Sequence, residues 1–432
     1  MAAERFALVI LDGLGDRPHP DTGGVSPVEA ASTPNLDRLV ARGSIGRVTV
    51  VGPGIAPESD AGVFALLGYD PVTDSPGRGV LEALGVGLDL AAGDVALRLN
   101  FATADGTGAI LDSRVGRTLT TEQSRSLAEA LTRADLLHDE GIRAEVRATV
   151  GHRGVLWLRP IDGRPLSKEV SNSDPFYEKV GGMGQARKVT DPRPLPVHPL
   201  DQSPSAARTA AAIDRFLALA GPVLAGHSVN ARRAMAGQKV ANSLLVRNAG
   251  ALPEHPVRSF QQRHGLAGAA VTEMPVERGI ARCLGLVDRF VGPMGRDRDA
   301  ALADRAKVTL DALRATPFVY VHLKGPDEPG HDGDARAKRD IVEALDRSFF
   351  GPFVAGADWA TTRVAVTADH ATPCIVKGHS DDPVPLVLAG AGVGAAAPSG
   401  KFGEPLAARG ALGDHRGAEV VDLLLGRTAA SR

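Results

Sequence analysis

The chain of 432 residues is poor in cysteine, in aromatic side chains and in net charge. Its two cysteines, Cys283 and Cys374, exclude a disulfide framework and suit a reducing compartment, so we expect a cytoplasmic protein. The 49 basic and 51 acidic side chains give a formal net charge of −2, which provides no electrostatic reason to expect a nucleic acid or a membrane as partner. No apolar stretch reaches the ~18 residues of a membrane-spanning helix, and we expect no signal peptide. Aromatic residues make up 4%, so the core must be aliphatic.

Four short apolar runs indicate strands that are buried on both faces: residues 6–11, 318–323, 363–367 and 385–389. Helical patterns separate several of them, as at residues 33–40, which open with a Thr-Pro start signal, and at 335–349. This alternation predicts an α/β fold with a parallel or mostly parallel sheet that is covered by helices on both faces.

Residues 95–185 follow a different pattern. They read as a strand (95–100), a helix (121–136) and two further strands (142–147 and 154–158), an order that fits a small α+β domain. Residues 186–207 are polar and rich in proline, which is typical of a linker. We therefore expect a core of residues 1–94 and 186–432 with a small domain, residues 95–185, inserted into it.

Seven residues stand out as possible metal ligands: Asp12, Ser59, Asp327, His331, Asp369, His370 and His379. Each is weak evidence alone, because an Asp-Gly after a strand is usually a turn and a lone histidine is usually structural. As a set, three imidazoles and three carboxylates at predicted strand ends suit two divalent metal ions. A serine hydroxyl held on such an ion is more easily deprotonated and becomes a better nucleophile.

The chain resembles a known family in ten motifs along nearly its whole length. They lie at residues 11–18, 33–37, 67–71, 77–79, 82–85, 100–103, 151–153, 324–327, 368–374 and 379–385. These motifs are similar to those of the archaeal-type, cofactor-independent (2,3-bisphosphoglycerate-independent) phosphoglycerate mutases, which belong to the alkaline phosphatase superfamily. The resemblance implies an alkaline-phosphatase-like sheet, with residues 95–185 capping the substrate and keeping water out.

The resemblance also implies a site and a reaction. One divalent metal (Mn, Zn or Mg) would be held by four ligands and a second by three: Asp12, Ser59, Asp369 and His370; then Asp327, His331 and His379. Ser59 would become a phosphoserine while 3-phosphoglycerate, a small phosphorylated substrate, is converted to 2-phosphoglycerate without 2,3-bisphosphoglycerate. Lys324 could neutralise a transferring oxygen, and Arg114, Arg117 and Arg153 could clamp the substrate's anionic groups. Arg232 and Arg233 are weaker candidates, because an arginine is usually a solvated surface residue.

Three departures from the family pattern leave the substrate open. Val63 stands where the family commonly has histidine, Ser113 replaces an arginine, and Ala418 replaces a second histidine. These changes permit a relative that acts on another phosphorylated or phosphonate substrate, for example a phosphotransferase to homoserine, or a phosphatase if water enters. A non-catalytic binding module is disfavoured, because all seven expected ligands are present.

Overall fold

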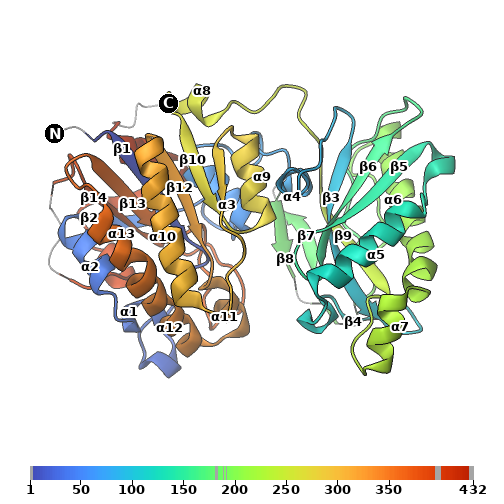
Figure 1. The fold of residues 1–432 in the computed structure, drawn as a ribbon, viewed down its shortest axis with the longest axis horizontal. Coiled ribbons are helices and arrows are strands. Elements are labelled where there is room, and N and C mark those ends of the chain that lie inside the picture. Colours follow the sequence, from blue (N-terminus) through green and yellow to red (C-terminus); the bar gives the residue numbers. More distant parts are fainter. Residues whose placement is uncertain (1–2, 181–182, 188, 191, 395–399, 428–432) are drawn as a thin grey trace. The chain divides into compact units, whose positions relative to one another are not determined.

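The computed structural model describes residues 3–180, 183–187, 189–190, 192–394 and 400–427, which form two compact units (Figure 1). Unit 1 comprises Met1–Ser75 and Arg258–Arg432, and unit 2 comprises Pro76–Val257. Unit 2 therefore contains the expected insertion but begins before residue 95 and ends well after residue 185. Residues 181–182, 188 and 191, beside the expected boundary, lie outside the described residues.

Unit 1 is built on an eight-stranded sheet in the order β11-β10-β12-β1-β13-β14-β2-β15. Neighbouring strands run parallel, except that β14 is antiparallel to both β13 and β2. The strands are β1 (Arg5–Leu11), β2 (Gly43–Thr49), β10 (Gly268–Thr272), β11 (Val287–Phe290), β12 (Phe318–Leu323), β13 (Thr362–Thr367), β14 (Val384–Gly390) and β15 (Gly413–Arg416). The mostly parallel sheet is thus confirmed, and the four expected strands are β1, β12, β13 and β14.

Helices cover both faces of this sheet, because every residue of β12 and β13 is buried although successive side chains point to opposite faces. α10 packs on β10, β12 and β1, and α2 packs on β2 and β14 (Figure 1). α15 packs on β1 and β13. The α-helices of unit 1 are α1 (Pro27–Ala30), α2 (Pro34–Ala41), α3 (Ser59–Leu66), α8 (Phe260–His264), α9 (Pro275–Cys283), α10 (Arg298–Ala315), α11 (Asp327–Asp332), α12 (Ala335–Leu345), α13 (Gly351–Gly356), α14 (Glu404–Ala407) and α15 (Val420–Leu425).

The helix expected at residues 335–349 changes type before its end. α12 stops at Leu345 and continues as a π-helical turn, η4 (Asp346–Phe350). The carboxylate of Asp346 accepts the backbone N–H groups of Asn35 and Leu36 at 3.1 and 2.8 Å. It therefore caps α2, whose own N-cap residue Thr33 makes no such bond.

Unit 2 contains an antiparallel sheet in which β3 lies between β6 and β9, β5 pairs with β6, and β4 pairs with the end of β3. Its elements are α4 (Arg78–Gly85), β3 (Val95–Ala104), β4 (Ile110–Asp112), η2 (Val115–Arg117), α5 (Thr121–Arg133), η3 (His138–Glu140), β5 (Ile142–Ala148), β6 (Arg153–Pro160), β7 (Tyr177–Val180), β8 (Met183–Ala186), α6 (Pro204–Ala225), α7 (Ser228–Met235) and β9 (Ser243–Gly250). The expected strands and helix of this region are all present.

The boundaries of unit 2 differ from the expected ones because β3 is paired over a long distance in the chain. Its neighbour β9 comes from beyond residue 240, and α6, which follows the expected linker, packs on β9. Odd-numbered residues of β3, such as Leu97 and Leu99, join the core formed with α5 and α6. The even-numbered Ala96 joins a separate cluster with Val80 of α4. The segment before residue 95, which carries α4, and the segment after residue 185, which carries α6, are therefore both needed to cover the two faces of one sheet.

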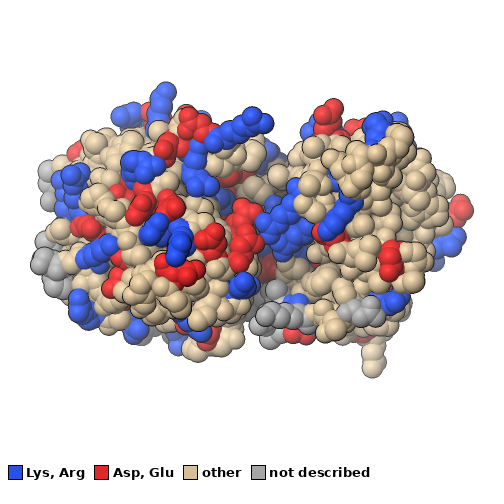
Figure 2. All heavy atoms as spheres, turned by 90° about the horizontal axis from the view of Figure 1, so that it is seen from below, with Lys and Arg blue, Asp and Glu red and all other residues tan. Residues whose placement is uncertain are grey.

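Two surface properties bear on partners. Lys and Arg are interspersed with Asp and Glu over the face seen in Figure 2, as the balanced composition suggests. Among the described residues no single helix is long and apolar enough to cross a membrane, although α6 and α7, which meet at a bend of 57°, reach that length and apolarity as a pair.

A buried ion pair in unit 2 gives a stability prediction. Arg247 and Asp174 pair with side chains 2% and 1% exposed, and the guanidinium also stacks on Tyr177. We expect Asp174→Asn to lower the free energy of unfolding by about 3–5 kcal/mol, because it leaves a buried charge uncompensated. The control Glu140→Gln removes an exposed partner of Arg215 and should cost less than about 1 kcal/mol. Urea unfolding measures both, and equal losses would contradict the prediction.

Candidate metal centre and anion site

The carboxyl ends of three adjacent parallel strands carry most of the candidate ligands. Asp12 follows β1, α11 begins at Asp327 shortly after β12, and Asp369 and His370 follow β13. Ile10 of β1 pairs with His322 on one side and with Thr367 on the other, so the three strands end at the same level. Open α/β sheets place their ligand sites at this edge.

The first cluster consists of Asp12, Ser59, Asp369 and His370. The Ser59 Oγ lies 3.3 Å from Asp12 Oδ1 and 3.3 Å from His370 Nε2. His370 Nε2 is in turn 3.5 Å from Oδ2 of Asp369. Oδ1 of the same carboxylate accepts the backbone N–H of Gly13. Ser59 is the first residue of α3, and Asp369 and His370 are buried. The four residues that the family resemblance assigns to one ligand set therefore do converge.

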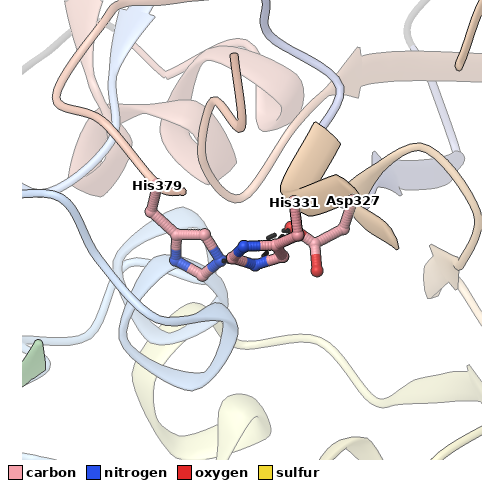
Figure 3. A group of neighbouring side chains, drawn as sticks. All are labelled: Asp327, His331 and His379. Atoms are coloured by element: carbon pink, nitrogen blue, oxygen red, sulfur yellow. Dashed lines mark hydrogen bonds and ion pairs between the residues drawn. The ribbon is translucent and has the colours of Figure 1, made fainter. Parts of the chain in front are cut away.

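The second cluster consists of Asp327, His331 and His379 (Figure 3). His331 Nε2 and His379 Nε2 are 3.2 Å apart, and they lie 3.5 and 3.4 Å from Asp327 Oδ1. His379 donates its Nδ1–H to the carbonyl of Pro57 at 2.8 Å, which leaves Nε2 as the atom aimed at the cluster. Two facing imidazole nitrogens at this distance need a proton or a cation between them.

The two clusters are neighbours, because the rings of His370 and His379 stack with centroids 3.8 Å apart. Their geometry fits metal binding. Nitrogen and oxygen ligands lie about 2.0–2.2 Å from zinc, so two tetrahedral ligands are roughly 3.3 Å apart. The separations of 3.2–3.5 Å in the second cluster and 3.3–3.5 Å around His370 Nε2 and the Ser59 Oγ match that value. In addition, the buried Asp369 Oδ2 accepts no hydrogen bond of good geometry among the described residues, although His322 Nε2 lies 3.3 Å away.

Lys324 is held beside the first cluster by two carboxylates. Its ammonium lies 3.2 Å from Asp12 Oδ2 and 3.0 Å from Glu277 Oε1. Although burial of Asp12 opposes ionisation, Lys324 and His322 hold its pKa well below the usual range. Lys324 therefore acts as a fixed positive charge that keeps Asp12 ionised.

Sequence reasoning missed two residues of this network, His322 and Glu277. His322 Nε2 lies 3.3 Å from Asp369 Oδ2, and its Nδ1 lies 3.3 Å from Glu277 Oε1. His322 sits inside the apolar run of β12, and Glu277 also caps α9 through the N–H groups of Glu273 and Met274. Neither position carries a motif, so only the packing of α9 beside β10 and β11 reveals them.

Unit 2 gathers several arginines near the buried carboxylate of Glu82. Glu82 of α4 is paired with Arg78 at 3.2 Å and Arg98 at 3.4 Å. Burial lowers the pKa of Arg153, and the positive charges of Arg78, Arg114 and Arg247 lower it further. The carboxylate of Glu82 acts in the opposite direction. Burial and the charges of Arg153, Arg114, Arg98 and Arg247 lower the pKa of His152 to about 3. This surplus of positive charge favours binding of an anion.

The other expected arginines have different surroundings. Arg114 and Arg117 line a hollow together with Ser113, and Arg117 is exposed. Arg233 is buried and donates to the Thr118 carbonyl and to Gln123 Oε1, so its role is structural. Arg232 is exposed, as a surface arginine would be.

The three departures also have distinct settings. Val63 is fully buried on α3, Ser113 is half-buried, and Ala418 is exposed in η5 (Gly417–Glu419). η5 packs against α3, so Val63 and Ala418 lie on contacting elements.

Comparison with known proteins gives one consistent result. Residues 41–230 match the model of the 2,3-bisphosphoglycerate-independent phosphoglycerate mutases. The chain is 44% identical to the protein of that name from Aeropyrum pernix, over 95% of this chain and 96% of that one. It is 40% identical to the one from Methanopyrus kandleri, over 98% and 96%. It is similar to the structure of a Pyrococcus horikoshii protein (TM-score 0.79, 30% identity, 100% of both chains). It is also similar to that of a cofactor-independent phosphoglycerate mutase from Thermoplasma acidophilum (TM-score 0.61, 32% identity, 97% and 98%).

The second cluster predicts proton release on metal binding. Burial of His379 disfavours its charged form, but the carboxylate of Asp327 outweighs burial and raises the pKa to about 9. The metal-free imidazole is therefore protonated at pH 7, whereas a metal ion needs its neutral form. We expect Mn²⁺ binding at pH 7 to release about one proton from this cluster, and affinity to rise with pH up to about 9. Titration calorimetry in two buffers of different ionisation enthalpy measures the protons, and an affinity independent of pH would contradict the assignment.

Proposed function

Because the chain belongs to the 2,3-bisphosphoglycerate-independent phosphoglycerate mutase family, we propose that it interconverts 3-phosphoglycerate and 2-phosphoglycerate through a phosphoserine on Ser59. The observation that carries this proposal is the position of the Ser59 hydroxyl, 3.3 Å from both Asp12 Oδ1 and His370 Nε2. Ser59 also opens α3, and the positive end of a helix dipole favours the negative charge of a phosphoryl group there.

The residues of the two clusters have the chemistry to hold divalent ions in the two sets that the family resemblance implies. Asp12, Ser59, Asp369 and His370 would hold one ion, and Asp327, His331 and His379 the other; this mixed oxygen and nitrogen set accepts Mn, Zn or Mg. Bound ions would lower the pKa of the Ser59 hydroxyl and offset the charge of the phosphoryl group. Lys324, held by Asp12 and Glu277, adds a fixed positive charge that the transfer does not consume.

The proposed reaction consists of two phosphoryl transfers. The Ser59 hydroxyl loses its proton and its Oγ forms a bond to phosphorus while the bond from phosphorus to the glycerate oxygen breaks, and that oxygen takes up a proton. The other glycerate hydroxyl then loses its proton and attacks the phosphoserine, which breaks the bond to Oγ, and Oγ takes up a proton to restore the serine. Ser59 carries the phosphoryl group in both directions, so no 2,3-bisphosphoglycerate is required. We assign the substrate's anionic groups to Arg114, Arg117 and Arg153, supported by the surplus of positive charge around Arg153.

Removal of the nucleophile tests the mechanism. Ser59→Ala should abolish interconversion of the two phosphoglycerates, because no acceptor for the phosphoryl group remains. The assay follows 2-phosphoglycerate and free phosphate together, starting from 3-phosphoglycerate with Mn²⁺. Ser32→Ala, an exposed serine of the same unit, serves as the control and should keep full activity.

The outcomes separate the competing functions. Isomerisation without phosphate release supports the mutase, whereas release of phosphate would identify a phosphatase. No turnover by a chain that binds Mn²⁺ would point to another phosphorylated substrate, and activity retained by Ser59→Ala would overturn the phosphoserine.

Substitution of Arg153 tests the anion site. Arg153→Ala should raise KM for 3-phosphoglycerate roughly tenfold to a hundredfold, because a charge-assisted hydrogen bond contributes about 1.5–3 kcal/mol. Arg125→Ala, which removes an exposed arginine of α5, should leave KM unchanged. Steady-state kinetics measures both, and an unchanged KM in Arg153→Ala would remove that residue from the substrate contacts.

A further inference from the structure

We propose that the hydroxyl of Thr372 is a positioning group that joins the two candidate metal clusters, so that each cluster orders the ligands of the other. Thr372 is no member of either ligand set. The inference deepens the proposed function and rests on it, because the clusters are the ones assigned there to divalent ions.

The Thr372 side chain is hydrogen-bonded to a ligand from each cluster. Its Oγ1 lies 2.7 Å from Asp327 Oδ1 of the second cluster and 3.0 Å from His370 Nδ1 of the first. An ionised carboxylate can only accept, so the single hydroxyl proton is donated to Asp327. The hydroxyl oxygen then accepts the Nδ1–H of His370.

This arrangement fixes the tautomer of His370. With the proton on Nδ1, the unprotonated Nε2 faces the Ser59 Oγ, 3.3 Å away, and presents a lone pair to the first cluster. The same hydroxyl holds Asp327 Oδ1, the atom that lies 3.5 and 3.4 Å from the two imidazoles of the second cluster. One hydroxyl thus orients a nitrogen ligand of one cluster and an oxygen ligand of the other.

The rest of Thr372 is held as firmly as its hydroxyl. The residue is fully buried, its N–H donates to the Gly15 carbonyl at 3.0 Å, and its own carbonyl accepts from Lys338 at 2.9 Å. Two glycines make room for it: a Cβ at Gly13 would lie 2.6 Å from Oγ1, and a Cβ at Gly330 would lie 2.4 Å from the carbonyl oxygen. The hydroxyl therefore has little freedom to leave its two partners.

Lys338 extends this restraint to the loops that carry the ligands. Its fully buried ammonium pairs with Asp16 at 2.8 Å and donates to the carbonyls of Gly15 and Thr372. The loop after β1 and the loop after β13 are thereby tied to α12, which follows α11 and its ligands Asp327 and His331. Thr372 lies where these three segments meet.

The test is Mn²⁺ titration by calorimetry of the parent chain, Thr372→Val and Thr372→Ser. Valine keeps the shape and removes the hydroxyl, whereas serine keeps the hydroxyl. We expect Thr372→Val to weaken the binding of both ions by about 10–100-fold, the usual effect of removing a group that orients metal ligands. Thr372→Ser should stay within about threefold of the parent, because its hydroxyl can make the same two hydrogen bonds.

A second pair of variants guards against misfolding. Thr372→Ala and Thr372→Ser both lose the methyl group and differ only in the hydroxyl, so a difference in Mn²⁺ affinity between them reports the hydroxyl even if the valine variant does not fold. Equal affinities in hydroxyl-bearing and hydroxyl-free variants would overturn the inference, and so would weakening of one ion alone. A parent chain that binds two Mn²⁺ ions but does not isomerise phosphoglycerate would overturn the proposed function and leave this inference standing.

Discussion

The structure of the site depends on the need to compensate carboxylates that the fold brings together and buries. Because β12, β1 and β13 are adjacent, parallel and in register, Asp12, Asp327 and Asp369 meet at one edge of the sheet, with Glu277 behind them. Like charges at such distances in a poorly solvated site are costly unless cations stand beside them. The chain supplies Lys324 and the imidazoles of four histidines, and the arrangement of the remaining oxygen and nitrogen atoms matches that required by divalent ions.

This requirement explains why so many polar groups near the site are arranged in pairs and relays. Burial and the positive charge of Lys324 disfavour the charged form of His322. The nearby carboxylates of Glu277 and Asp369 outweigh both effects and raise the pKa of the imidazole to about 9. The Thr372 hydroxyl accepts a hydrogen bond from His370 and donates one to Asp327. Lys338 donates to the Thr372 carbonyl and so fixes the backbone there. Each group satisfies a buried neighbour, so the candidate ligands are held in place by hydrogen bonds and ion pairs within the protein. Such preorganisation suits the proposed reaction, in which Ser59 would accept and return a phosphoryl group in the same place.

Unit 2 meets the opposite electrostatic condition. Arg78, Arg98 and Arg153 surround one carboxylate, Glu82, and the pKa of His152 is lowered to about 3 by burial and by the neighbouring guanidinium groups. One unit thus concentrates carboxylates that require cations, and the other concentrates cations that favour an anion. The anionic groups of a phosphorylated carboxylic acid are of the kind that such a cluster of guanidinium groups binds.

The sequence by itself determined the strands of the central sheet and its mostly parallel character, because buried strands leave a local pattern, and its motifs pointed to the seven candidate ligands. The tertiary structure decided the features that depend on contacts between distant segments of the chain. The true extent of unit 2 depends on the pairing of β9 with β3, and Glu277 and His322 owe their roles to neighbours far away in the chain. Thr372 lies within the family motif at residues 368–374. Its hydroxyl can join the two clusters only because the loops after β12 and β13 are brought within hydrogen-bonding distance. Local propensity is a property of a few consecutive residues, whereas register, burial and charge compensation are properties of segments that meet only in the folded chain.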